Sequence, residues 1–196
     1  MKFSGCLGVI IFILSFSANS AEHPKYQSNY LGQEKRLIKS LSADDIQQLK
    51  QGKGWGLAKA AELNGLPGPA HILQMKDKIS LSKEQEAKIQ ALFEDMKSKA
   101  IPLGNELIEL EKNLNDSFAT RTITKELLQQ QLDSISDVHK RLRYVHLETH
   151  LLTPKILTSA QIEQYNQLRG YNSDDPCKNI PEGHDAEMWK KHNDCK

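Results

Sequence analysis

The fold is decided by residues 83–118, which read KEQEAKIQALFEDMKSKAIPLGNELIELEKNLNDSF. Apolar residues recur in this stretch at alternating steps of three and four, and they are Ile89, Leu92, Phe93, Met96, Ala100, Leu103, Leu107, Leu110, Leu114 and Phe118. This spacing places them along one side of an α-helix, in a seam like that of a heptad repeat. Pro102 removes one backbone hydrogen bond and Gly104 loosens the same turn. We therefore predict one long kinked helix, with two collinear helices as the alternative.

A second seam follows a short turn at residues 119–124. Its apolar positions again step by three and four, and they are Leu128, Leu132, Ile135, Val138, Leu142, Val145, Thr149 and Leu152. The pattern predicts a second long helix over about 125–152, which Thr124 can cap. Pro154 ends or kinks that helix, and a last helix is expected from about 159 to 168.

Two long amphipathic helices joined by a short turn form an αα-hairpin. Alone, they leave half of each apolar stripe uncovered, so short helices or a second subunit must cover the rest. The predicted fold class is therefore all-α: a long kinked antiparallel helical hairpin with short flanking helices, paired into a homodimer.

Composition supports a helical fold and excludes one class of function. The 196 residues are 38% hydrophobic, 26% charged and only 6% aromatic, which favours helices over a β-sandwich or barrel. Twenty-six basic and 25 acidic residues leave a formal charge of +1. This balance excludes a nucleic-acid binder that works by bulk positive charge.

Residues 1–21 have the three parts of a secretory signal peptide. Lys2 is followed by an apolar run at 7–16 and by small residues at 17–21. The run is shorter than the roughly 20 residues that a membrane span needs, although an uncleaved anchor is the alternative. We expect export to the periplasm, cleavage after Ser20 or Ala21, and no stable membrane insertion.

The remaining chain divides into three parts. Residues 22–69 are predicted to form a lead with short helices, 70–170 the hairpin domain, and 171–196 a tail. Whether residues 54–73 pack on the hairpin is left open by the sequence. Cys6 leaves with residues 1–21, so two cysteines remain, and an even number in an exported chain predicts a disulfide between Cys177 and Cys195. If reduced, these cysteines could instead bind zinc or copper together with the tail histidines His184 and His192.

One short pattern occurs three times, as LSADD at 41–45, LSKEQ at 81–85 and LTSAQ at 157–161. In such a capping box the Ser or Thr side chain accepts from the amide three residues on, and the third residue reaches back to the cap amide. The capping residues of the second and third copies are Leu81, Ser82, Gln85, Leu157, Thr158 and Gln161.

Together these features resemble the LTxxQ family, over roughly residues 70–170. That family contains Spy/CpxP-type periplasmic chaperones and periplasmic heavy-metal sensors and zinc-resistance proteins. The segment 54–73 and the closing residues 168–171 are similar to a subgroup labelled heavy-metal sensor or Spy/CpxP chaperone. The resemblance implies a curved hairpin that pairs into a dimeric cradle. The chain departs from the LTPEQ consensus, and its tail lacks the His-rich run of the zinc-binding members.

Three histidines form a stripe beside the second seam: His139, His146 and His150. His146 and His150 are four residues apart, a spacing that lets two imidazoles share one metal ion. The resemblance assigns metal binding to a pair at this place. His71 is either a third ligand or a first-turn surface residue. No cofactor is required by this interpretation, and zinc, nickel or copper is the ion that the pair could bind. The alternative is that the histidines line a polar shoulder of the hairpin and bind nothing.

Basic residues near the hairpin suggest a second kind of site. The resemblance implies that a basic, partly apolar concave face holds unfolded clients, and Lys140 and Arg143 are the candidates. No catalytic motif is present in the sequence, so we expect no enzyme. The expected function is an ATP-independent envelope chaperone or stress protein, whose partners are unfolded envelope proteins or an envelope-stress sensor. The alternatives are a heavy-metal sensor or buffer, and a structural adaptor.

Overall fold

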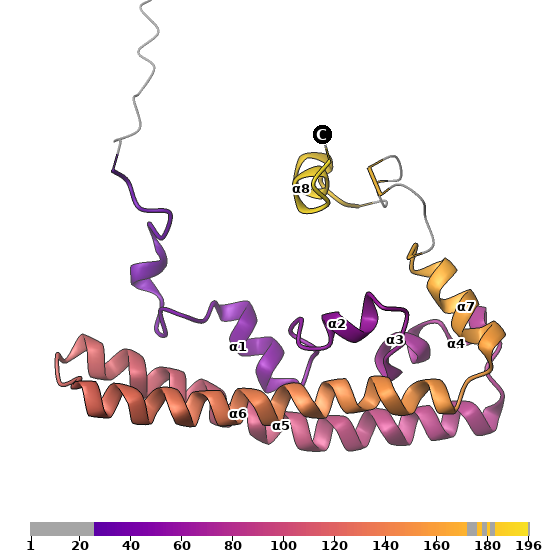
Figure 1. The fold of residues 1–196 in the computed structure, drawn as a ribbon, viewed down its shortest axis with the longest axis horizontal. Helices are drawn as coiled ribbons and strands as arrows, with labels where there is room; N and C mark the ends of the chain where they lie inside the picture. Colours follow the sequence, from indigo (N-terminus) through magenta and orange to yellow (C-terminus); the bar gives the residue numbers. More distant parts are fainter. Residues whose placement is uncertain (1–25, 172–175, 178–179, 181–182, 196) are drawn as a thin grey trace, which may run out of the picture. The chain divides into compact units, whose positions relative to one another are not determined.

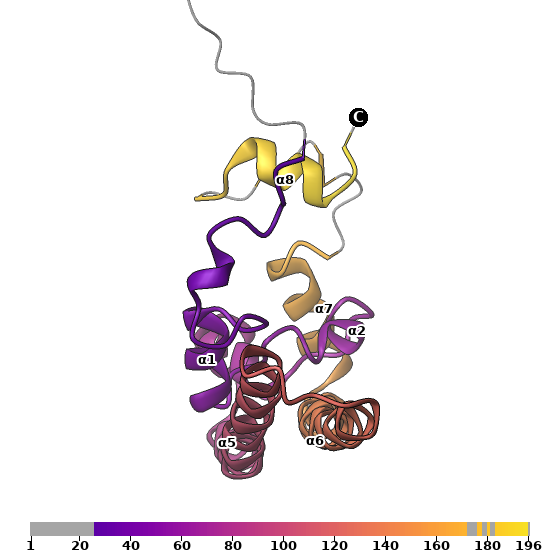
Figure 2. The ribbon, with the colours of Figure 1, turned by 90° about the vertical axis from the view of Figure 1, so that its left-hand side faces the viewer.

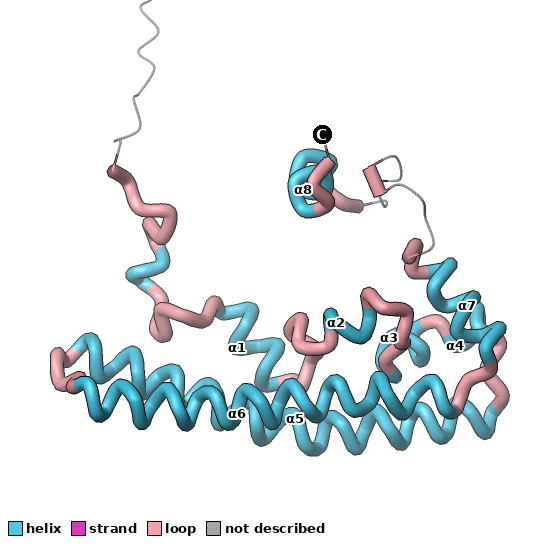
Figure 3. Tube along the Cα trace, viewed as in Figure 1, coloured by secondary structure: helices cyan, strands magenta, loops and turns pink. Residues whose placement is uncertain are grey.

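The computed structural model describes residues 26–171, 176–177, 180 and 183–195. Every regular element in those residues is helical, and none is a strand, which confirms the all-α prediction (Figure 3). The chain divides into two compact units, Met1–Glu34 and Lys35–Lys196. The elements below, apart from the 3-10 helix η1 (Gln33–Lys35) at the boundary, belong to the second unit. The predicted signal peptide lies outside the described residues.

Two long helices form the body of the second unit. Helix α5 (Lys83–Ala119) is continuous through Pro102, so the single-helix prediction is correct and the alternative of two helices is wrong. Helix α6 (Lys125–Leu152) begins after a short turn, with the Thr124 side chain accepting from the Leu127 amide. The two helices lie side by side and run in opposite directions (Figures 1 and 2).

Short helices cover the middle and one end of this pair. They are α1 (Ala43–Lys50), α2 (Lys59–Glu62), α3 (Pro69–Gln74), α4 (Lys76–Ile79), the 3-10 helix η2 (Thr153–Lys155) and α7 (Ser159–Leu168), and the tail carries α8 (Ala186–His192). Helices α1 and α3 pack on α5, α2 packs on α6, and α4 packs on α7. The question that the sequence left open is therefore answered: residues 54–73 do pack on the long helices.

The apolar core consists of two clusters. The larger joins α1 and its flanks to α5 and α6 through Ile38, Leu41, Leu49, Leu57, Met96, Ala100, Leu103, Leu107, Ile108, Val138, Leu142 and Val145. The smaller joins α3 and α4 to α5 and α7 through Ile72, Ile79, Ile89 and Tyr165. Not every predicted seam position is covered, because Phe118 is 54% exposed and Leu132 is 42% exposed. The short helices bury the middle of the seam and leave the end near the turn open.

Gly104 has a packing role that the sequence analysis did not predict. The helix does not end or loosen into a second element there. Instead, a Cβ atom at this position would lie 2.4 Å from the Leu49 carbonyl oxygen, at the end of α1. A contact this short is sterically impossible, so the glycine permits the close approach of α1 to α5.

The second and third copies of the capping pattern meet in space. Ser82 and Thr158 each cap a helix, with Gln85 and Gln161 bonding back to the cap amides. The two glutamine side chains also bond to each other, since the Gln85 amide nitrogen donates to the Gln161 oxygen at 2.9 Å and the reverse bond is 3.0 Å. Gln85 further donates to the Ile156 carbonyl at 2.9 Å. The repeated motif thus ties the start of α7 to the start of α5.

Two further predictions concern the tail and the membrane. Cys177 and Cys195 form the predicted disulfide, which closes a loop with a sequence separation of 18. Among the described helices, none has both the length and the apolar character required of a membrane span.

Candidate functional site

A cleft of about 840 Å³ lies between the 51–59 loop, helices α2 and α3, and the middle of α5 and α6. We call it the histidine cleft, because His71, His146 and His150 all line it. Its apolar wall is formed by Trp55, Pro69, Phe93, Met96 and Ile101. Its size lies within the range typical of small-molecule sites.

His146 and His150 are buried in this cleft. His146 is 3% exposed and His150 is 8% exposed, because α2 and the chain at residues 66–68 cover this part of α6. His150 Nδ1 lies 2.7 Å from the Leu66 carbonyl oxygen. Its Nε2 lies against Gly68, where an added Cβ would be 2.5 Å away. Both residues therefore lie in a covered part of α6, and metal binding by this pair stays a prediction.

His139 and His71 lie nearer to solvent. The His139 ring packs edge-on against Trp55, with the ring centroids 6.1 Å apart. The His71 side chain is 37% exposed, as a first-turn residue would be, but its Nδ1 lies 3.2 Å from Glu62 Oε1. The structure therefore brings the three candidate metal ligands, His71, His146 and His150, to one cleft, but His71 is half-exposed while the other two are buried.

The centre of the polar network is Glu62, at the end of α2. Its Oε1 accepts hydrogen bonds from the hydroxyls of Tyr165 and Tyr171, the latter at 2.8 Å. Arg169 Nε lies 3.2 Å from the same oxygen. The other oxygen, Oε2, is buried and has no hydrogen-bond partner in the described part of the chain, and His150 Nδ1 is 4.0 Å away. Glu62 thus joins α2 to α3, α7 and the residues after α7, with all its donors on one oxygen.

The surroundings shift several pKa values in this network. Burial by itself raises the pKa of Glu62, but hydrogen bonds from His71, Tyr165 and Tyr171 outweigh it and lower the pKa to about 2. Burial, with a smaller effect of the His150 charge, lowers the pKa of His146 to about 4. Burial and the bond to Glu62 raise the pKa of Tyr165. At neutral pH the site therefore holds an ionised carboxylate and a neutral His146 imidazole.

The histidines do not present a shared set of ligand atoms in this arrangement. His71 Nδ1 is bonded to Glu62 and His150 Nδ1 to a carbonyl, while His146 Nε2 is buried without a partner among the described residues. No group of three or more His, Cys, Asp or Glu side chains in the described residues is placed to hold a metal ion. As they stand, these residues do not fit a three-ligand metal site.

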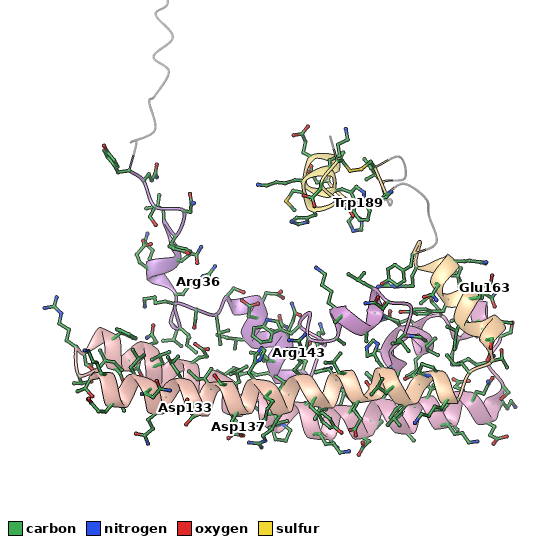
Figure 4. All side chains as sticks on the ribbon, in the orientation of Figure 1. Arg36, Asp133, Asp137, Arg143, Glu163 and Trp189 are labelled. Carbon is green, nitrogen blue, oxygen red and sulfur yellow. A yellow bond between two sulfur atoms is a disulfide. The ribbon has the colours of Figure 1, made fainter. Side chains whose placement is uncertain are left out.

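The candidate client-binding residues lie outside the cleft, on α6. We define the α6 outer face by exposed or half-buried positions between residues 136 and 151: Ser136, Lys140, Arg143, Tyr144, Leu147 and Leu151. Part of it forms a shallow depression, which includes Lys140, Arg143, Tyr144 and Leu147. Lys140 Nζ pairs with Asp137 at 2.7 Å, whereas Arg143 makes no ion pair within the described residues. Figure 4 labels Arg143, Asp137 and Asp133 on this helix.

Sequence reasoning missed the importance of Glu62 and did not identify Tyr165 or Arg169. One signal was available: Glu62 is an acidic residue in a short helix between glycine-rich turns, and the packing of such a helix decides where its carboxylate lies. The partners lie more than 100 positions away in the chain, however, so no local spacing connects them. No protein-family model, curated protein or solved structure matches the chain.

Proposed function

We propose that the protein is a periplasmic, ATP-independent chaperone of the Spy/CpxP type, which holds unfolded envelope proteins on its long helices. The observation that carries this proposal is the α6 outer face. Tyr144 is 62% exposed beside Arg143, which makes no ion pair within the described residues, and Leu151, further along the same helix, is 60% exposed. Contiguous apolar groups on a surface favour contact with other chains. A neighbouring positive charge would draw in acidic unfolded segments.

The test is suppression of aggregation of a chemically unfolded client, followed by light scattering. We expect Leu151→Ser and Arg143→Glu each to weaken suppression several-fold, because both residues are exposed and their loss removes contacts rather than stability. Leu37→Ser and Lys125→Glu are the matched controls, since Leu37 is 75% exposed and Lys125 is exposed, and both lie outside the face. High salt should weaken the contribution of Arg143. Equal activity of all four variants would contradict the proposal.

We further propose that two copies pair through the end of the hairpin near the 120–124 turn. Phe118 and Leu132 both lie in that half and are left exposed by the short helices. A second copy would cover them and complete the seam. Sedimentation equilibrium should show a dimer that dissociates more readily in Phe118→Ser than in Leu151→Ser. A monomer at all concentrations would contradict the pairing.

Metal sensing or buffering is the second candidate function, favoured by the gathering of His71, His146 and His150 in one cleft. Binding through Nδ1 of His71 or of His150 would require that nitrogen to leave its present partner. Under this alternative, calorimetry with zinc, nickel or copper should show submicromolar binding that His146→Ala or His150→Ala abolishes. Under the chaperone proposal, client holding should survive both substitutions. Tight metal binding without an effect on client aggregation would reverse the order of the two candidates.

A further inference from the structure

The histidine cleft holds two buried polar atoms that nothing in the described chain satisfies. His146 Nε2 and Glu62 Oε2 are both without a hydrogen-bond partner there, and both residues line the cleft. The two residues are more than nine-tenths buried, at 3% and 8% exposed. Buried polar groups in folded proteins are nearly always paired, so two orphaned groups at one cleft point to a ligand that supplies the missing bonds.

The buried end of such a ligand must be neutral. Glu62 is ionised, but Arg169 lies 3.2 Å from its Oε1 and already opposes that charge. A further charge brought into this buried region would lose its hydration without a free counter-ion. A hydroxyl or primary amide avoids that loss, because it can donate to Glu62 Oε2 and also bond to an imidazole nitrogen.

The body of the ligand must be apolar. Trp55, Phe93, Met96 and Ile101 line the cleft beside the polar end. Aromatic and thioether groups favour contact with an aromatic ring. A cleft of about 840 Å³ has room for a compact organic molecule.

The solvent side of the cleft carries positive charge. Lys53 and Lys59 are exposed and Lys97 is half-buried, and all three line the cleft. None of them makes an ion pair within the described ranges, and Glu62 is the only acidic residue in the lining. Lys97 Nζ already lies over the Phe93 ring, 5.6 Å from its centroid, so the charges left to attract an anion at this concave surface are those of Lys53 and Lys59.

We propose that the histidine cleft binds a small amphipathic organic anion, with an apolar body against Trp55 and Phe93, a neutral hydroxyl or amide at His146 and Glu62, and an acidic group toward the lysines. This site is separate from the α6 outer face, so it does not depend on the chaperone function.

The test compares three probes: 3-(4-hydroxyphenyl)propanoate, 3-phenylpropanoate without the hydroxyl, and 3-(4-hydroxyphenyl)propanamide without the charge. Binding is followed by the emission of Trp55 in a Trp189→Phe background, because Trp189 lies in the tail. We expect the hydroxylated acid to bind roughly tenfold more tightly than either analogue. No change in emission up to about 10 mM probe, or equal affinity for all three, would overturn the proposal.

Two sets of variants separate the ends of the ligand. His146→Leu replaces the imidazole with an apolar side chain of similar size and should abolish the preference for the hydroxyl. The double variant Lys53→Gln, Lys59→Gln leaves the interior intact and should remove the preference for the acid over the amide. Lys125→Gln is the control at a distant exposed lysine. If these variants leave the preferences unchanged, or if only an unfolded client and none of the probes alters Trp55 emission, the assignment is wrong.

Discussion

At the residue scale, His146 illustrates how burial converts a titratable group into a pH-dependent element of stability. Its pKa is lowered to about 4, mainly by burial, against 6.5 for an ordinary histidine. Between these values the unfolded chain binds a proton that the folded chain does not. Stability therefore falls as pH drops through that window and is fully present above about 6.5.

We predict that lowering the pH from 7 to 4 costs the protein about 3 kcal/mol through His146 alone, at about 1.4 kcal/mol per pKa unit. In His146→Leu this loss should be absent. Thr149→Val, a change in the same cleft that does not titrate, should shift the whole stability curve and keep its slope. Urea unfolding at several pH values measures both. An unchanged slope in His146→Leu would show that the histidine is not buried as described.

At the element scale, the position of α1 depends on one missing methyl group. A Cβ on Gly104 would clash with the Leu49 carbonyl, which is backbone and cannot rotate away. We predict that Gly104→Ala destabilises the protein by about 1–3 kcal/mol, despite the higher helix propensity of alanine. Gly54→Ala is a control, because an added Cβ there meets nothing within 4 Å. Hydrogen exchange should show faster exchange in α1 of Gly104→Ala, while the far end of α5 stays protected.

The paired glutamines of the repeated motif form a second contact between elements. Gln85 and Gln161 bond to each other in both directions as well as to their own caps. Substitutions of residues that share a hydrogen-bond network do not have additive effects on the free energy of unfolding. In a double-mutant cycle with Gln85→Ala and Gln161→Ala we predict a coupling energy of about 1 kcal/mol from thermal or urea unfolding. Additive effects would mean that the two caps act independently.

The elements were predictable because their signals are local. The steps of three and four gave α5 and α6 with their observed limits, and the capping pattern marked the start of α7. The contacts between elements were not predictable in the same way. Glu62 meets Tyr165 across 103 positions, and Gly104 meets a backbone carbonyl whose position depends on the packing of α1. Periodicity shows which side of a helix is apolar, but it does not show which short segment covers it.

At the scale of the whole molecule, the two apolar clusters draw their described residues from between 38 and 165. Tyr171, the first tail residue, packs against the smaller cluster, whereas none of the described residues at 176–195 belongs to either cluster. The disulfide between Cys177 and Cys195 closes a loop within that tail. Its entropic effect on the unfolded chain, of about 3 kcal/mol for a loop of this length, therefore applies to the tail and not to the long helices.

We predict that reduction of the disulfide, or Cys195→Ser, leaves the main thermal unfolding transition within about 2 °C of the untreated protein. Protection of α8 against proteolysis should be lost, because a seven-residue helix is not stable alone. Circular dichroism at 222 nm follows the long helices, and limited proteolysis with mass spectrometry follows the tail. Leu142→Asp is the positive control, since Leu142 is 1% exposed in the larger cluster and a buried charge should lower the main transition strongly. If reduction lowers the midpoint as far as Leu142→Asp does, the prediction is wrong, because the disulfide then supports the core as well as the tail.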